Sequence, residues 1–202
     1  EIQLKVLQEV IRLSDRVVVM SKRAVGMLQE IYGVPGEKIA HIPHGIPDVP
    51  FVDSNFFKDL FGVEGKKVIL SFGLLSRNKG IEYMIDAMPA ILEKHPDTVY
   101  IILGATHPHV KRTEGEEYRL SLQKIVQDLK VDRQVIFQNR FVELSELCEF
   151  LGASDVYVTP YLNAEQISSG TLSYALGTGK ATVSTPYWYA EETLAEGRGV
   201  LV

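Results

Sequence analysis

The sequence lacks several features that mark whole classes of proteins. It has one cysteine, Cys148, which cannot form an internal disulfide and fits a reducing compartment, so we expect a cytoplasmic protein. Its longest apolar runs have the length of strands, which excludes a transmembrane helix. The net charge is -5 with acidic residues spread evenly, so neither nucleic acid nor an anionic membrane surface is an expected partner.

What the sequence does contain is a large apolar fraction. Hydrophobic residues make up 46% of 202 residues, enough for one ample core or slightly more than one domain. The sequence starts without methionine in a predicted helix, with Ile2, Val6 and Val10 at helical spacing, and ends in a predicted strand. We therefore expect a piece of a larger protein.

Predicted strands and helices alternate along the chain. Apolar runs predict strands at 15–21, 39–42, 68–73, 98–104, 134–138, 155–159 and 181–185, and the first of these is expected to be buried. Helical spacing predicts helices at 21–32, 55–61, 116–129, 145–152, 169–176 and 188–196, and one from Ile81 that Pro89 should kink or restart. This alternation predicts an α/β fold with a Rossmann-like, doubly wound parallel sheet and helices on both faces.

Residues 68–80 carry the strongest functional signal. A buried strand ends at Gly73, a short polar loop carries Arg77 and Lys79, and an amphipathic helix begins at Ile81. Glycine lets a ligand approach the backbone, and the free N–H groups of a helix start attract anions, so this turn suits a phosphate. The alternative is an ordinary tight turn with solvated basic residues, because the GxxxxGK[ST] and GxGxxG spacings are both missing.

A second polar turn, at residues 160–170, also precedes an apolar helix. It contains Glu165, Gln166, Ser168, Ser169 and Gly170. Ligands of doubly wound sheets bind outside the carboxyl ends of the strands, so both helix starts should face one rim and together suit a diphosphate. No histidine lies near the two serines in the sequence, so a nucleophilic triad is not expected.

Other chemically capable side chains have plainer interpretations. His107 and His109 are expected to be a loop pair rather than metal ligands, residues 111–117 a solvated loop and helix start, and Cys148 a small buried hydrophobe. Four aromatic residues flank the predicted rim, namely Tyr161, Tyr187, Trp188 and Tyr189. They either stack on a base or sugar of a ligand or, as such residues more commonly do, pack against other protein side chains.

Four segments, read together, resemble a known family. They are KIAHIPHGIPD at 38–48, SFGLLSRNKGIEYMIDAMPAI at 71–91, ELCEFLGASDVYVTPY at 146–161 and SSGTLSYALGTGKATVSTP at 168–186. In order and spacing they are similar to the retaining, sugar-nucleotide-dependent glycosyltransferases of family 4 (group 1), which have the two-domain GT-B fold.

The resemblance implies a division of the chain and an activity. Residues 1–48 would be the tail of an amino-terminal, acceptor-side domain with its linker, and residues 49–202 a donor-binding, Rossmann-like domain. The implied enzyme transfers a sugar with retention from a nucleotide diphosphate sugar to a saccharide, lipid-linked or small-molecule acceptor. This piece alone is expected to be inactive, and membrane contact would belong to the missing amino-terminal part.

The resemblance also implies site residues, position by position. Gly73 and Lys79 match the family's phosphate contacts, and Glu165 or Gln166 falls at the first glutamate of its paired-glutamate motif, near the donor sugar. The loop that meets the nucleotide base is matched by Asn139, Arg140 and Phe141. The turn that contacts the sugar and phosphate is matched by Ser169, Gly170 and Thr171.

Three positions depart from the family pattern. Leu74 stands where arginine usually follows the glycine, so Arg77 is expected to supply the second cation. Tyr174 stands at the second glutamate, which should hold the ribose, so Tyr174 is either a ribose contact or a core residue. His44 replaces the usual asparagine before Gly45, which we interpret as a turn variation.

The implied mechanism is electrostatic. Lys79, Arg77 and the two helix starts would stabilise the charge of the departing diphosphate, so neither cofactor nor metal is expected. Glu165 would stabilise positive charge on the donor sugar or hold a hydroxyl, and otherwise is an ordinary loop acid.

Two alternative functions remain open at this point. One is a GT-B relative such as a sugar-nucleotide epimerase or a glycogen-synthase-like protein, and the other is a non-catalytic, degenerate binding module. The two enzyme hypotheses, a glycosyltransferase and a GT-B relative, both require that the helix starts near Lys79 and Ser169 face a common cleft.

Overall fold

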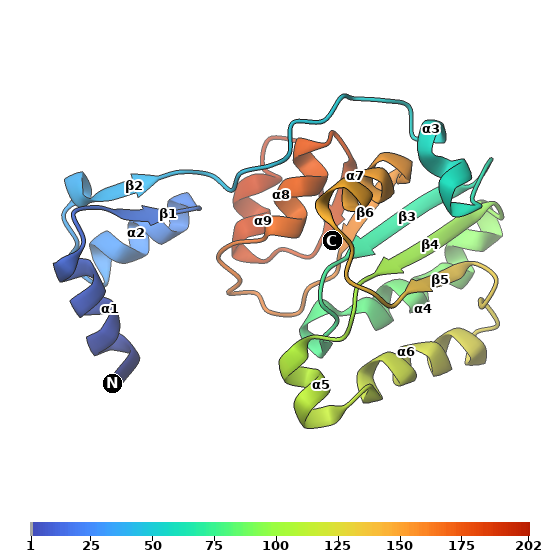
Figure 1. The fold of residues 1–202 in the computed structure, drawn as a ribbon, viewed down its shortest axis with the longest axis horizontal. Coiled ribbons are helices and arrows are strands. Elements are labelled where there is room, and N and C mark those ends of the chain that lie inside the picture. Colours follow the sequence, from blue (N-terminus) through green and yellow to red (C-terminus); the bar gives the residue numbers. More distant parts are fainter. Residues whose placement is uncertain (1) are drawn as a thin grey trace.

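The amino-terminal part of the chain forms a small unit of its own. The computed structural model describes residues 2–202, and Glu1 lies outside the described residues. Helix α1 (Ile2–Leu13) is followed by β1 (Val17–Val19), α2 (Lys22–Glu30), the short 3-10 turn Gly36–Lys38 and β2 (Ile39–His41). The two strands pair in parallel (Figure 1). Ser21 caps α2 as predicted, because its Oγ accepts a hydrogen bond of 3.2 Å from the Ala24 N–H.

The prediction that the first strand is buried is wrong. Val18, in the middle of β1, is 55% exposed. A strand is buried only where both faces of its sheet are covered, and this sheet has two strands with α2 packed beside them. An apolar sequence alone does not reveal how many layers surround a strand.

An extended segment connects this unit to the rest of the chain. Residues 42–54 contain neither helix nor strand and run across the outside of α8 (Gly170–Gly177) (Figure 1). Ile46 and Phe51 of this linker lie directly against Gly177 and Gly179 of the α8 segment. The linker is therefore seated on the second unit.

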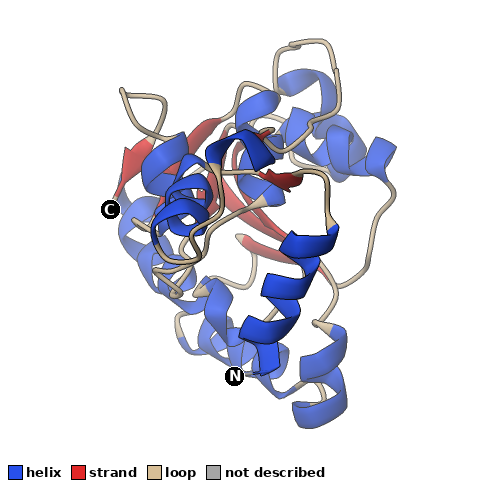
Figure 2. Ribbon diagram, turned by 90° about the vertical axis from the view of Figure 1, so that its left-hand side faces the viewer, coloured by secondary structure: helices blue, strands red, loops and turns tan. Residues whose placement is uncertain are grey.

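The second unit is built on a six-stranded parallel sheet. Its strands, red in Figure 2, follow the order β5-β4-β3-β6-β7-β8. The strands are β3 (Lys67–Phe72), β4 (Thr98–Leu103), β5 (Val135–Gln138), β6 (Val156–Thr159), β7 (Ala181–Ser184) and β8 (Val200–Leu201). The predicted doubly wound, Rossmann-like α/β fold is therefore confirmed.

Helices cover both faces of this sheet, as predicted. They are α3 (Asn55–Lys58), continued by the 3-10 turn Asp59–Phe61, then α4 (Ile81–Lys94), α5 (Pro108–Glu114), α6 (Glu117–Asp128), α7 (Leu144–Ala153), α8 (Gly170–Gly177) and α9 (Trp188–Thr193). Strand β3 shows the alternation: Val68 and Leu70 pack in the core beneath α7, α8 and α9, whereas Ile69 packs with α4 and α6.

The strand order has its switch point between β3 and β6. From β3 the chain proceeds outward through β4 to β5, then returns across the sheet and proceeds the other way through β6, β7 and β8. The connections on either side of this point leave on opposite faces, so a crevice opens at the carboxyl ends of β3 and β6. Gly73 and Pro160 follow those two strands.

Two local predictions differ from the structure. Helix α4 runs unbroken through Pro89, so of the two alternatives, a kink or a restart, the restart does not occur; burial of Ile85 and Met88, in the turn before Pro89, outweighs the hydrogen bond that Pro89 cannot donate. Residues 108–114, expected to be loop, form α5 with Pro108 in its first turn and the His107 side chain accepting from the His109 N–H at 3.2 Å.

Candidate functional site

The two predicted helix starts meet at the switch point of the sheet. Gly73, directly after β3, has φ +125°, and a β-carbon built there would lie 3.3 Å from Thr171 Cγ2 and 4.0 Å from Lys79 Nζ. Residues from the β3–α4 loop and from the first turn of α8 thus share one small space. The common cleft on which the sequence-based prediction depended is present.

The Lys79 ammonium group is held at this point by its loop. Gly80 has φ +58°, and a β-carbon there would lie 2.0 Å from the Pro160 carbonyl oxygen, so the loop packs tightly on the end of β6. The Leu162 N–H donates to the Asn78 carbonyl oxygen at 3.0 Å. Lys79 Nζ lies 3.8 Å from the centroid of the Tyr161 ring, and within residues 2–202 it forms no ion pair. Its charge is therefore available to an anion.

A chain of hydroxyl groups lies beneath Lys79. Tyr161 Oη and Thr171 Oγ1 share a hydrogen bond of 2.9 Å, and Thr171 Oγ1 lies 3.2 Å from Ser169 Oγ. Ser169 caps α8 by accepting from the Leu172 N–H at 3.3 Å. The N–H groups of Gly170 and Thr171 form no hydrogen bond with the described residues, so they remain free to donate.

Tyr157, on β6, has a hydroxyl group that is fully buried and has no hydrogen-bond partner in the described chain. Burial and then the nearby Tyr161 raise its pKa well above the ordinary value, so it keeps its proton. It lines a cavity of about 10 Å³, together with Gly73, Lys79 and Tyr161. An unpaired buried donor is costly, and this one faces the same cleft. No sequence pattern distinguishes Tyr157 from the other buried tyrosines.

A larger cavity of about 180 Å³ opens beside Gly73. It is lined by residues from the ends of β3, β4 and β5 and by Thr171: Phe72, Gly73, Leu74, Leu103, Gly104, Ala105, Arg140, Phe141, Val142, Leu147 and Thr171. Arg140 and Phe141 thus line a cavity next to Gly73, whereas Asn139 is exposed and is not one of the lining residues; the role of all three at a nucleotide base stays a prediction. Arg140 is paired with Glu146, and its hydrogen bond holds the pKa of that carboxyl below its usual value.

Arg77 is not brought to this cleft as a free second cation. Its Nε lies 3.4 Å from Glu114 Oε2, and its Nη2 donates to Glu117 Oε1 at 3.1 Å. Helix α5, which the sequence did not predict, supplies Glu114, and α6 supplies Glu117. Two carboxylates therefore compensate the charge that we expected to face phosphate.

Glu165 and Gln166 lie on the loop between β6 and α8. Glu165 is exposed, and its backbone N–H donates to Asn163 Oδ1 at 3.1 Å. Gln166 is half-buried: its Nε2 donates to the Ser168 carbonyl at 3.0 Å, and its own carbonyl accepts from the Tyr189 N–H at 3.1 Å. The loop is tied to α9, and the Glu165 carboxylate stays open to solvent.

Most of the rim aromatics pack rather than offer a stacking face. Tyr161 and Tyr187 are buried and stack on each other at 5.3 Å, and Tyr189 is buried as well. Burial raises the pKa of Tyr187 to about 12. Trp188 instead carries the Arg23 guanidinium at 4.0 Å from its ring centroid.

Tyr174 is half-buried on α8, packed against the core beneath that helix. Its ring meets the His44 ring edge-on, with centroids 5.7 Å apart and planes at 79°. Tyr174 thus packs as a core residue, one of its two interpretations, and it also reaches the linker, whereas its role as a ribose contact stays a prediction. His44, interpreted as a turn variation, is in fact in contact with α8.

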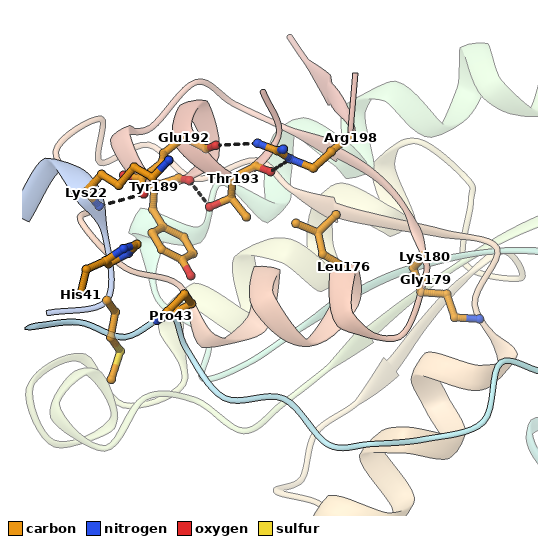
Figure 3. A pocket seen from close by; sticks show the side chains of 11 residues that line it. Lys22, His41, Pro43, Leu176, Gly179, Lys180, Tyr189, Glu192, Thr193 and Arg198 are labelled. Atoms are coloured by element: carbon orange, nitrogen blue, oxygen red, sulfur yellow. Dashed lines mark hydrogen bonds between the residues drawn. The ribbon is translucent and has the colours of Figure 1, made fainter. Parts of the chain in front are cut away.

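A more voluminous cavity of the described residues lies elsewhere. It measures about 550 Å³ and opens between the amino-terminal unit and the far end of α8, and Figure 3 shows its lining. Glu192 of α9 spans this boundary: its carboxylate accepts from the backbone N–H groups of Lys22 at 2.8 Å and Arg23 at 3.2 Å. None of the predicted site residues lines this cavity.

No helix among residues 2–202 combines the length and the apolar character that a membrane crossing requires. The same residues contain no group of three or more histidine, cysteine or acidic side chains placed to hold a metal ion.

Comparison with known proteins identifies the family. Residues 53–202 match the family model of the glycosyl transferases group 1. Mannosylfructose-phosphate synthase of Agrobacterium fabrum is 27% identical over 197 residues, which cover 94% of this chain and 42% of that protein. An uncharacterized glycosyltransferase of Methanocaldococcus jannaschii is 32% identical over 155 residues, covering 73% of this chain and 36% of that protein.

Solved structures show the same fold. Anabaena HepE, solved in complex with UDP and glucose, superimposes with a TM-score of 0.76 at 20% identity, over 100% of this chain and 53% of that one. Sucrose-phosphate synthase from Thermosynechococcus elongatus gives 0.74 at 21% identity, over 100% and 48%. The chain thus spans about half the length of these relatives, or less. Since the family model matches from residue 53 to residue 202, the chain belongs to the group 1 glycosyl transferases, with the fold of the GT-B enzymes.

Proposed function

We propose that the complete protein transfers a sugar from a nucleotide diphosphate sugar to an acceptor, and that this chain supplies the donor-binding part. Family membership supports glycosyl transfer, and the UDP and glucose in the HepE structure support a nucleotide-sugar donor. The observation that carries the proposal is the shared space of Gly73, Lys79 and Thr171 at the switch point of the sheet.

The chemistry of this space suits a diphosphate leaving group. As the glycosidic bond breaks, negative charge accumulates on the diphosphate, and groups that are already oriented stabilise it at little reorganisation cost. Lys79 supplies a full charge without a carboxylate partner, and Gly170 and Thr171 supply free N–H groups at a helix start. Gly73 leaves room for the phosphates to approach the backbone.

The proposal extends to the remaining donor groups, with the cavity beside Gly73 supporting the place of the base and the family resemblance supporting those of the ribose and the sugar. The base would enter the cavity of about 180 Å³ beside Arg140 and Phe141. The ribose would lie toward Tyr174, as the resemblance implies. The exposed Glu165 carboxylate would hold a hydroxyl of the transferred sugar or stabilise its developing positive charge. Arg77 could join Lys79 only after leaving Glu114 and Glu117, so Lys79 is the principal cation of this proposal.

Several finer statements belong to the same proposal. Membership of family 4, retention of configuration and independence from metal follow from the resemblance, as does the assignment of residues 1–48 to an acceptor-side domain. A saccharide, lipid-linked or small-molecule acceptor would bind there, and the single cysteine supports a cytoplasmic location. An assay of the complete protein with and without EDTA, following the anomeric configuration of the product by NMR, tests retention and metal independence together.

The first experiment is calorimetric titration of the protein with UDP, GDP, ADP and their sugar conjugates. Binding of one nucleotide diphosphate and its conjugate is the expected result. Absence of measurable binding to every nucleotide would overturn the proposal and favour a degenerate module without donor affinity. Turnover of the conjugate to its epimer without an acceptor would point instead to a sugar-nucleotide epimerase.

A further inference from the structure

The linker between the two units lies in a fixed register on α8. Glycines of the α8 segment make room for linker side chains: a β-carbon on Gly177 would lie 2.2 Å from Ile46 Cδ1, and one on Gly179 would lie 2.8 Å from Phe51 Cε2. The same contact occurs at the start of the helix, where a β-carbon on Gly170 would lie 2.8 Å from His44 Nε2. The linker therefore delivers the His44 ring to the first turn of α8.

The hydrogen bonding of His44 defines which ring nitrogen is free. Its Nδ1 lies 2.7 Å from the Gly45 carbonyl oxygen, which can only accept, so Nδ1 carries the hydrogen of the neutral ring. Nε2 then has a lone pair and forms no hydrogen bond with the described residues. The ring is held between Gly170 and the Tyr174 ring, so this acceptor is fixed in place.

The first turn of α8 thus offers both kinds of hydrogen-bonding group. Phosphate oxygens only accept, so they complement Lys79 and the free N–H groups of Gly170 and Thr171. An acceptor such as Nε2 complements a hydroxyl group, and a nucleotide sugar carries hydroxyls on its ribose and on the transferred sugar. Two other observations indicate that a ligand belongs at this cleft, namely the cavity of about 180 Å³ beside Thr171 and the unpaired buried hydroxyl of Tyr157.

We propose that His44 is a donor-recognition residue whose Nε2 accepts a hydrogen bond from a hydroxyl group of the bound nucleotide sugar. The inference rests on the proposed function, because it assigns a role at the same site. It gives the linker a part in substrate recognition, in addition to its part in joining the two units. It also supplies an acceptor beside Tyr174, where the resemblance implies that a ribose-binding glutamate is missing.

The test separates the acceptor from the shape of the side chain. In His44→Gln the amide oxygen can take the place of Nε2, whereas in His44→Asn the shorter amide reaches only as far as Nδ1. With the nucleotide that the wild type binds, we expect His44→Asn to bind about 5- to 10-fold more weakly, the loss of one neutral hydrogen bond, and His44→Gln to bind like the wild type. Ile46→Ala, which loosens the linker without removing the acceptor, is the matched control and should leave affinity unchanged.

The ligands used in the titrations distinguish the two sources of the hydroxyl. If His44→Asn already binds the nucleoside diphosphate more weakly than the wild type, and this loss of affinity is absent with the 2′- or 3′-deoxy analogue, the hydroxyl belongs to the ribose. If His44→Asn loses affinity only for the sugar conjugate, the hydroxyl belongs to the transferred sugar. Equal losses in His44→Asn, His44→Gln and Ile46→Ala, or no loss in His44→Asn, overturn the inference while leaving the proposed function intact. A wild-type protein that binds no nucleotide overturns both.

Discussion

The ammonium nitrogen of Lys79 lies 3.8 Å from the centroid of the Tyr161 ring. The aromatic face holds the cation in place but leaves its charge uncompensated, whereas a carboxylate would neutralise it. Tyr161 also shares a hydrogen bond with Thr171, so one buried side chain connects the cation of the β3–α4 loop to the first turn of α8. The two halves of the proposed diphosphate site are thereby held together before any ligand binds.

Removing the Lys79 charge should weaken nucleotide binding far more than removing that of Arg77. A charge-assisted contact to phosphate contributes about 1.5–3 kcal/mol, so Lys79→Ala should lose roughly 10- to 100-fold in affinity by calorimetry. Arg77→Ala is the matched control from the same loop and should change affinity less than about 3-fold, because Arg77 is paired with Glu114 and Glu117. A larger effect in Arg77→Ala would show that Arg77 leaves its partners to meet the ligand.

Asp155 should stabilise the second unit, and its contribution should depend on pH. It pairs with Lys58 at 2.9 Å, accepts from Ser54 at 2.6 Å and accepts from the Val68 N–H at 2.7 Å, while Lys58 is only 3% exposed. Burial raises the pKa of this carboxyl, but the hydrogen bonds from Ser54, Val68 and Lys58 outweigh it and leave the pKa lowered. Asp155→Asn should therefore cost about 3 kcal/mol of unfolding free energy at pH 7.

The sign of the pH dependence follows from the lowered pKa. The stabilisation is fully present above the unfolded-state pKa of about 4 and is lost as the pH falls through the folded-state value. In urea unfolding, the difference between wild type and Asp155→Asn should thus shrink on acidification below about pH 4. Asp97→Asn, which removes an exposed pair with Lys66, is the control and should cost less than about 1 kcal/mol at pH 7. A difference in unfolding free energy between wild type and Asp155→Asn that does not change with pH would contradict this explanation.

Gly80 should tolerate no side chain. A β-carbon there would lie 2.0 Å from the Pro160 carbonyl oxygen, which is backbone and cannot turn aside. Gly80→Ala should cost about 3 kcal/mol, combining the left-handed conformation with the clash. Gly62→Ala has nearly the same φ, +64° against +58°, but open space around it, so it should cost only about 1 kcal/mol. Similar losses in the two variants, measured by urea unfolding, would mean that the loop moves to relieve the clash.

Glu192 should stabilise α2 across the boundary between the two units. Its carboxylate accepts from the first N–H groups of that helix, at 2.8 and 3.2 Å, and capping interactions of this kind contribute about 1 kcal/mol. In Glu192→Ala, amide hydrogen exchange at Lys22 and Arg23 should therefore accelerate by roughly 5-fold. Glu191→Ala, at the neighbouring exposed position, should leave those amides unchanged, and equal effects in both variants would rule out a specific cap.

Much of the fold follows from local patterns in the sequence. The apolar runs ending at Phe72, Leu103 and Thr159 predict strands because a parallel strand is buried on both faces, and helical spacing from Ile81 predicts α4 because one face must meet the sheet. Helix α5, which was not predicted, does have a sequence signal, because proline is favoured in a first helical turn and Pro108 lies there. The histidines on either side of it favoured the interpretation as a loop.

The site itself was only partly predictable. Thr171 was implied by the family resemblance, whereas Gly73, Lys79 and the turn that ends at Gly170 follow from the strand-end rule, because the carboxyl ends of parallel strands share one edge of the sheet. The pairing of Arg77 with Glu114 and Glu117 does not, since it depends on how α5 and α6 fold back toward that loop. Nor does the unpaired hydroxyl of Tyr157, because sequence patterns show which residues are buried but not which polar atoms find partners.

The sequence by itself determined the alternation of strands and helices, the glycine after β3 and the presence of two basic residues in one loop, since each depends on neighbours along the chain. Only the tertiary structure decided which of the two cations faces the cleft, that β1 stays exposed, and that His44 lies on Gly170. Those outcomes depend on contacts between segments far apart in sequence, whose geometry no local periodicity encodes.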